Sequence, residues 1–140
     1  MESDRTDRPR VRTLMVDDHP AFLDELAHLL EEDGEMNIVG RAVSGENALE
    51  QVGALRPDLV LMDLAMPGMG GLKATRHLKI NMGAGAPRII VLSLHEHAMY
   101  QLAARDAGAD GFVPKSKLGA LLLPKIHSLF PSVVGDAVSG

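Results

Sequence analysis

The chain has 140 residues, of which 46% are hydrophobic and 24% charged, as is usual for one soluble globular domain. A formal net charge of −5 argues against a nucleic-acid-binding surface, and the lack of cysteine excludes disulfides and thiolate metal sites. No stretch approaches the roughly 20 apolar residues of a membrane span. The charged start is not a signal peptide, so we expect a cytoplasmic protein without membrane contacts.

Five short apolar stretches, several of them rich in β-branched residues, are predicted to be strands. They cover residues 11–16, 36–43, 58–63, 88–94 and 111–115. Pro114 marks the last of them as the end of a ladder or as an edge strand.

Five stretches with helical apolar spacing alternate with these strands. The predicted helices begin near residues 20, 44, 72, 96 and 116 and end near residues 34, 57, 81, 107 and 130. Pro20 suits the first turn of its helix, which Asp18 is placed to cap. Pro124 should kink or split the last helix.

This alternation over short connections predicts βαβ units, and therefore an α/β fold with a parallel sheet and helices on both of its faces. We expect one domain over residues 11–130. Residues 1–10 are predicted to be a disordered extension, and residues 131–140 a flexible tail.

Asp63 ends the strand predicted over residues 58–63 and opens into a loop with one proline and three glycines in residues 67–71. Ligands bind at the carboxyl ends of strands in open α/β sheets, so this carboxylate is a candidate site residue. On its own, Asp63 is equally well explained as the end of the strand or as a helix cap.

Parallel strands bring their carboxyl ends to one edge of the sheet, whatever their separation in the sequence. That edge is predicted to carry Asp17, Asp18, Asp63, Ser93 and Lys115. Three crowded carboxylates repel one another, each close pair by about 1–4 kcal/mol at surface-like dielectric. A hard divalent cation bound through oxygen would compensate them, and Mg²⁺ is the favoured ion.

With the ion and Lys115 nearby, Asp63 should stay ionised and act as a nucleophile. A phosphoryl group on Asp63 would then meet the metal, the ammonium of Lys115 and the hydroxyl of Ser93. The alternative interpretation is a plain acidic patch, which the hydroxyl and the amine at neighbouring strand ends disfavour.

Four stretches of this sequence resemble the receiver domain of two-component response regulators. They read VDDHP (16–20), LMDLAMPGMGG (61–71), VLS (91–93) and AGADGFVPKS (107–116). The resemblance covers about residues 11–130. The early Asp-Asp-His-Pro and the late Lys-Ser are similar to the subgroup that is usually joined to LuxR-type DNA-binding domains.

The resemblance implies a flavodoxin-like, doubly wound sheet of five parallel strands in the order 2-1-3-4-5. It implies that Asp63 accepts a phosphoryl group from a sensor histidine kinase. Mg²⁺ would be held by Asp18, Asp63 and the backbone carbonyl of Ala65, with Asp17 assisting through water.

The resemblance also implies a switch formed by Ser93 and Phe112, whose two states alter the face made by the fourth helix, fifth strand and fifth helix. Ala65 and His95 match the positions that tune the lifetime of the phosphoryl group. A homodimer, and an output domain or protein partner outside this chain, are among the implied partners.

Other polar residues are expected to be structural. His95 and His97 stand two residues apart, which fits a loop pair better than a metal site, and His19 should pack or cap. The helix over residues 72–81 has a basic face that we expect to be solvated, with docking to a kinase as the minor alternative. That face consists of Lys73, Arg76 and Lys79.

Three classes of function compete. The first is a phosphorylation switch, either as a stand-alone adaptor or as a piece of a longer regulator, since a helix-turn-helix output module needs roughly 60 further residues. The second is an aspartyl-phosphate hydrolase of the haloacid dehalogenase type, which needs a second acid where this chain has Ala65. The third is a scaffold that never takes phosphate.

Overall fold

The computed structural model describes residues 10–131 and 133, and the extension and tail expected at the two ends lie almost entirely outside these residues. Five parallel strands form one sheet in the order β2-β1-β3-β4-β5, which confirms the predicted order. The strands are β1 (Val11–Val16), β2 (Met36–Ala42), β3 (Leu59–Asp63), β4 (Arg88–Ser93) and β5 (Gly111–Pro114). Pro114 therefore lies on an edge strand, as expected.

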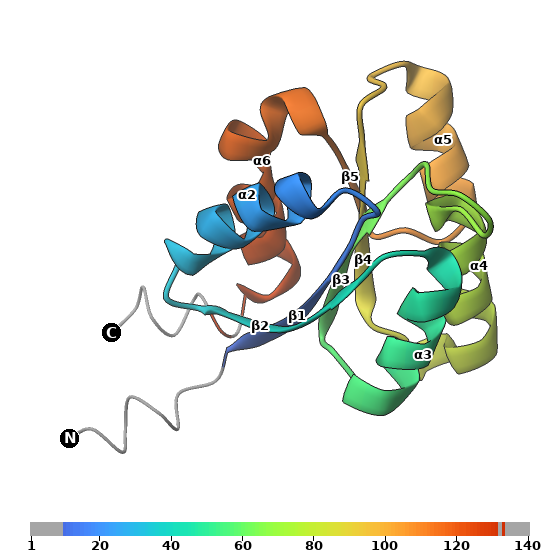
Figure 1. The fold of residues 1–140 in the computed structure, drawn as a ribbon, viewed down its shortest axis with the longest axis horizontal. Helices are drawn as coiled ribbons and strands as arrows, with labels where there is room; N and C mark the ends of the chain where they lie inside the picture. Colours follow the sequence, from blue (N-terminus) through green and yellow to red (C-terminus); the bar gives the residue numbers. More distant parts are fainter. Residues whose placement is uncertain (1–9, 132, 134–140) are drawn as a thin grey trace.

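Helices cover both faces of the sheet. They are α2 (Pro20–Glu31), α3 (Gly45–Leu55), α4 (Gly71–Met82), α5 (Ala98–Asp106) and α6 (Leu118–Leu129), with short 3₁₀ turns at Gly83–Gly85 and Lys115–Lys117. In Figure 1, α2 and α6 lie on one side of the sheet and α3, α4 and α5 on the other. The doubly wound α/β prediction is confirmed. No helix among the described residues has the length and apolar character to cross a membrane.

The central strand β3 explains the two-sided core. Leu59 and Leu61 belong to the hydrophobic cluster under α2 and α6, whereas Val60 and Met62 belong to the cluster under α3 and α4. All four side chains are fully buried. Successive strand residues point to opposite faces, so a strand covered on both faces must be apolar throughout. The buried strand ends in Asp63, which is thereby held at the edge of the sheet.

The start of α2 and the course of α6 bear on two of the predictions. The N-cap of α2 is His19, so Asp18 stands one residue too early to cap this helix. Helix α6 runs through Pro124 without being split, because Leu118, Leu122 and Ile126 bury its inner face around the exposed proline. Packing of that face outweighs the backbone hydrogen bond that proline cannot donate.

Lys79 does not belong to a solvated basic face. Its ammonium donates to Asp110 Oδ2 at 2.7 Å and to the carbonyl of Pro87 at 2.9 Å. Lys73 and Arg76 are exposed, as expected. The helical pattern placed Lys79 on a polar face, but it could not show that Pro87 and Asp110 lie against this side chain.

Candidate functional site

The carboxyl ends of β1, β3 and β5 bring three charged side chains into direct contact. Lys115 Nζ lies 2.7 Å from Asp17 Oδ2 and 2.9 Å from Asp63 Oδ1. Only 9% of the Lys115 side chain is exposed, against 1% for Asp17 and 7% for Asp63. Residues 98 positions apart in the sequence thus form a buried ion network at one edge of the sheet.

The loop after Asp63 is folded tightly against the end of β3. The N–H of Gly71 donates to the carbonyl of Leu64 at 3.0 Å, and the N–H of Leu64 donates to Leu92 on β4 at 2.9 Å. A Cβ on Gly71 would lie 2.0 Å from the carbonyl oxygen of Asp63, so only glycine fits there. Helix α4 therefore begins directly against the Asp63 backbone, and Ala65 is exposed in the intervening loop.

Asp18 and His19 extend the site toward α2. Asp17, Asp18 and His19 each offer a ligand atom within 4.8 Å of the others. Asp18 Oδ1 is buried and accepts no hydrogen bond from the described residues, although His19 Nδ1 approaches it to 3.1 Å. An acid cluster with an unpartnered buried oxygen suits a hard divalent cation, which prefers oxygen ligands.

Electrostatics at the site favour binding of further positive charge. Burial raises the pKa of Asp63, and Asp17 adds to this, while the hydrogen bond from Lys115 only partly opposes it. Burial also disfavours the Lys115 ammonium, but Asp17 and Asp63 outweigh this effect and raise its pKa. The prediction that Asp63 stays ionised relied on a metal ion as well as on Lys115. The protein groups alone leave the pKa of Asp63 raised from its ordinary value.

His19 bridges the two neighbouring acids. Its Nδ1 lies 3.0 Å from Asp17 Oδ1, and its backbone N–H donates to the same oxygen at 2.8 Å. The hydrogen bond with Asp17 and the charge of Asp18 raise the pKa of His19. His19 occupies the N-cap position of α2, but its side chain makes no cap hydrogen bond and contacts the acid cluster instead.

Ser93 lies on β4, which pairs with β3, and Phe112 lies on β5, the edge strand beyond β4. Ser93 is buried at the end of β4, one residue beyond the position paired with Asp63, and its Oγ accepts the N–H of His95 at 2.9 Å. Phe112 is half-buried on β5, paired in register with Val91.

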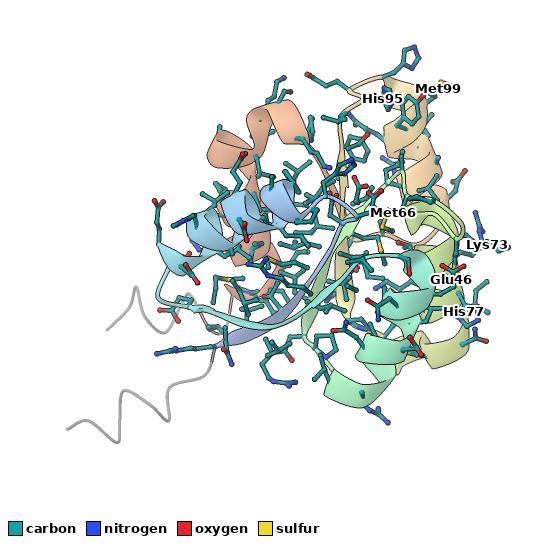
Figure 2. All side chains as sticks on the ribbon, viewed as in Figure 1. Glu46, Met66, Lys73, His77, His95 and Met99 are labelled. Atoms are coloured by element: carbon teal, nitrogen blue, oxygen red, sulfur yellow. The ribbon has the colours of Figure 1, made fainter. Side chains whose placement is uncertain are left out.

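The exposed ring of His95 stacks on Tyr100, with ring centroids 4.7 Å apart. His97 caps α5 by accepting the N–H of Met99 at 3.2 Å, in keeping with a loop pair. Figure 2 shows His95 and Met99 at the same end of the molecule, by the start of α5.

Two neighbours of the site were missed in the sequence. The ring of Phe22 lies 4.1 Å from Lys115 Nζ, although its spacing marked it only as part of an apolar helix face. Glu96 accepts a hydrogen bond from Ser116 Oγ at 2.6 Å and lies 3.5 Å from Lys117 Nζ, which ties the β4–α5 loop to the turn after β5. No local pattern signals a contact across 20 residues.

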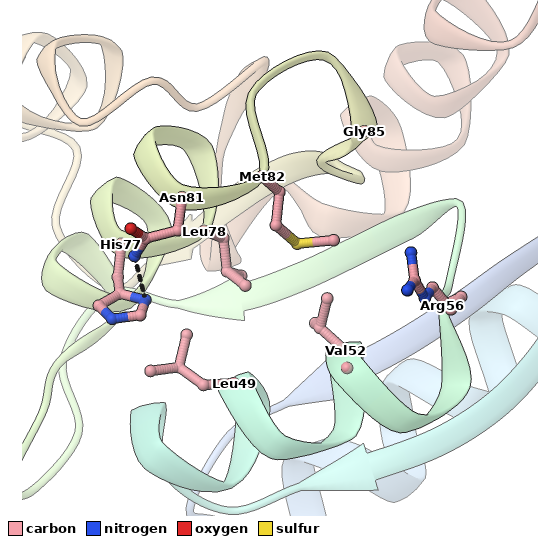
Figure 3. A pocket seen from close by; sticks show the side chains of 9 residues that line it. Leu49, Val52, Arg56, His77, Leu78, Asn81, Met82 and Gly85 are labelled. Atoms are coloured by element: carbon pink, nitrogen blue, oxygen red, sulfur yellow. Dashed lines mark hydrogen bonds between the residues drawn. The ribbon is translucent and has the colours of Figure 1, made fainter.

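A cavity of about 410 Å³ lies away from these acids, between α3 and α4 (Figure 3). Leu49, Val52, Leu78 and Met82 form its apolar lining, and His77 forms a hydrogen bond with Asn81 at 3.0 Å at one side. No residue of the acid and lysine network lines it. The charged side chains of the candidate site therefore lie at the carboxyl ends of the strands and not in this cavity.

Comparison with known proteins agrees with this geometry. The model of the response regulator receiver domain matches residues 13–126. A LuxR-family response regulator from Aurantimonas superposes with a TM-score of 0.82 at 34% identity, covering 88% of this chain and 86% of that one. The receiver domain of the response regulator NarL from Mycobacterium tuberculosis gives a TM-score of 0.76 at 30% identity, covering 91% and 98%.

Curated relatives include much longer proteins. Protein-glutamate methylesterase/protein-glutamine glutaminase 2 of Pseudomonas fluorescens is 38% identical over 129 residues, which are 85% of this chain and 34% of that protein. A protein of the same activity from Nocardioides is 38% identical over 135 residues, or 88% of this chain and 37% of that protein. The chain spans about a third of the length of these relatives. The chain belongs to the response regulator receiver domain family.

Proposed function

We propose that Asp63 is the phosphoacceptor of this receiver domain, which we take to span residues 11–130. The observation that carries the proposal is the Lys115 ammonium, which bridges Asp17 and Asp63 while Asp18 Oδ1 lacks a hydrogen-bond partner. Such an arrangement holds a nucleophilic carboxylate beside a fixed cation. The negative charge that remains allows a second cation to bind.

In the proposed reaction, a carboxylate oxygen of Asp63 forms a bond to phosphorus as the bond from phosphorus to the donor breaks. The donor is the phosphohistidine of a sensor histidine kinase. Lys115, already 2.9 Å from Asp63 Oδ1, offsets the negative charge of the transferring group. The buried hydroxyl of Ser93, at the end of the next strand, is placed to donate to a phosphoryl oxygen.

We assign the metal site to Asp17, Asp18, Asp63 and the backbone carbonyl of Ala65, with Asp17 acting through water. When bound, Mg²⁺ would offset the charge of the acids and of the phosphoryl group. Metal binding would give a partner to the buried Oδ1 of Asp18, which has no hydrogen bond among the described residues.

The output would follow from a switch of Ser93 and Phe112 that alters the face formed by α5, β5 and α6. A cavity of about 200 Å³ beside Phe112, between these elements, gives the ring space to change position. Exposed Met99 and Leu102 on α5 offer apolar area to a protein partner or a second copy. Ala65 and His95, both exposed, would tune the lifetime of the phosphoryl group.

The activity named for the curated relatives is not proposed for this chain, which we regard as a switch without an external substrate. The hydrolase alternative needs a second acid two residues after Asp63. Ala65 stands there and has no group able to transfer a proton.

Intact-mass measurement after incubation with acetyl phosphate and Mg²⁺ tests the acceptor. Wild type and Asp24→Asn, an exposed acid on α2, should each gain one phosphoryl mass, whereas Asp63→Asn should gain none. An adduct that persists in Asp63→Asn would overturn the assignment. Failure of wild type to take up any phosphoryl group would support the scaffold alternative.

A further inference from the structure

The ammonium of Lys115 has a third neighbour that the phosphorylation chemistry leaves unused. Two of its contacts are the carboxylates of Asp17 and Asp63, and the third is the ring of Phe22, whose centroid lies 4.1 Å from Nζ. We propose that Phe22 is a positioning residue for Lys115, a role that rests on the proposed function of Asp63 as phosphoacceptor. The ring face would hold the ammonium over the site through a cation–π contact.

The surroundings make this contact strong. A cation within about 6 Å of a ring centroid is attracted to the negative face of the ring, and the attraction grows when water is excluded. The Lys115 side chain is only 9% exposed, and Phe22 is partly buried against the hydrophobic cluster beneath α2. The ring therefore occupies a direction in which an exposed ammonium would be hydrated.

An aromatic ring also suits the movement that phosphoryl transfer requires. The ammonium must change its hydrogen-bond partners when Asp63 gains phosphoryl oxygens. A ring face attracts the cation without a lone pair that would fix one N–H direction. Phe22 would keep Lys115 at the same place while its partners change.

Phe22 packs against the hydrophobic cluster under α2 only as a partly buried side chain. Leu23, Leu26 and Leu30 already fill the core under α2, and each is nearly fully buried. The chain is poor in aromatic side chains, with three phenylalanines, one tyrosine and no tryptophan. One of these few rings lies against the lysine of the acid network.

The first test measures the contact itself. Protons above a ring face are shifted upfield, so the Hε signals of Lys115 in the NMR spectrum should move downfield in Phe22→Leu. Phe130→Leu is the matched control, because Phe130 is also partly buried against the same cluster but lines a different cavity, beside Pro57 and Pro87. Unchanged Lys115 signals in Phe22→Leu would overturn the proposal.

The second test measures phosphorylation by acetyl phosphate. Phe22→Leu should slow it by about 3- to 10-fold, the size of a partly desolvated cation–π contact, and Phe22→Tyr should restore it. Trifluorinated phenylalanine at position 22 keeps the shape but weakens the ring face, so it should also slow the reaction. An unchanged rate with the fluorinated ring, or an equal loss of Mg²⁺ affinity, would contradict a positioning role.

The two tests separate this inference from the proposed function. If wild type takes no phosphoryl group, the acceptor assignment fails, and the Lys115 signals alone then decide whether Phe22 holds the ammonium. If wild type is phosphorylated and Phe22→Leu reacts at the same rate, only the role of Phe22 is overturned.

Discussion

Two clusters of acids and bases lie at opposite edges of the same sheet. At the amino ends of β4 and β5, Asp110 accepts hydrogen bonds from Lys79 at 2.7 Å, Arg88 at 3.1 Å and the backbone N–H of Ile89 at 2.8 Å. We call this group the Asp110 cluster. At the carboxyl ends, the single ammonium of Lys115 pairs with two carboxylates, and His19 lies close to a third, whose Oδ1 accepts no hydrogen bond from the described residues.

The balance of charge differs between the two clusters. Burial disfavours the Asp110 carboxylate, but Lys79, the Ile89 N–H and Arg88 outweigh it and lower the pKa of Asp110. At the other edge, burial and the neighbouring acids raise the pKa of Asp63 in spite of Lys115. The compensated Asp110 carboxylate stabilises the fold, whereas the uncompensated negative charge near Asp63 is where we propose that Mg²⁺ binds.

The largest effect should come from Lys115→Met. Removing a positioned cation that offsets developing charge slows a reaction by about 10²–10³-fold, so phosphorylation by acetyl phosphate should fall by that order. A time course of intact mass measures it. Lys115→Arg keeps the charge and should retain part of the rate. A Met variant that reacts as fast as wild type would contradict the role of Lys115.

Breaking the Asp110 cluster should lower the stability of the fold without changing the rate of phosphorylation. Asp110→Asn weakens charge-assisted bonds to Lys79 and Arg88 and should lower the free energy of unfolding by about 1–3 kcal/mol. Urea unfolding measures this loss, and phosphorylation of the folded variant should continue at the wild-type rate. A variant as stable as wild type would show that the cluster is not structural.

Removing a negative charge from the candidate site should slightly stabilise the metal-free protein. Asp18→Asn removes one of the crowded negative charges and should raise the free energy of unfolding by about 1 kcal/mol in the presence of a chelator. Added Mg²⁺ should stabilise wild type against urea but not this variant. An equal response of both proteins to Mg²⁺ would remove Asp18 from the proposed metal site.

In metal-free protein, Asp110 and Asp63 should contribute to the pH dependence of stability with opposite sign. The folded pKa of Asp110 is lowered, so its contribution is complete above the unfolded value of about 3.9 and is lost as the pH falls through the folded value. The folded pKa of Asp63 is raised, so its contribution is complete below about 3.9 and is lost as the pH rises through the folded value.

Urea unfolding across this acidic range checks the signs. Asp110→Asn should remove part of the loss of stability on the acid side, and Asp63→Asn should remove part of the loss on the other side. Asp24→Asn, which changes an exposed acid on α2, is the reference. If both substitutions changed the pH dependence of stability in the same direction, the contrast between the two clusters would be contradicted.

The sequence predicted which charged residues lie at the carboxyl ends of the strands, because the signals for strand ends are local. The run that ends in Asp63 is apolar throughout, which marks a strand covered on both faces and places its last residue at the edge. The same reasoning applied to Val16 and Pro114 brought Asp17 and Lys115 to that edge. The order of the strands came from the family resemblance and not from periodicity.

The remaining contacts depend on packing between distant segments. Lys79 and Asp110 are 31 residues apart, so the helical pattern assigned Lys79 to a solvated face. Phe22 was placed on the correct helix face, but spacing does not reveal what lies above a ring. The continuity of α6 through Pro124 depends on burial of Leu122 and Ile126, which only the assembled core provides.

The stacking of His95 on Tyr100 has a practical consequence. Tyr100 is the only tyrosine and the chain has no tryptophan, so intrinsic fluorescence reports from this one ring. The imidazole that covers it belongs to the loop whose backbone N–H bonds to Ser93. A rearrangement of that loop that separates the two rings would alter the emission, which gives the protein a built-in optical probe that needs no added dye.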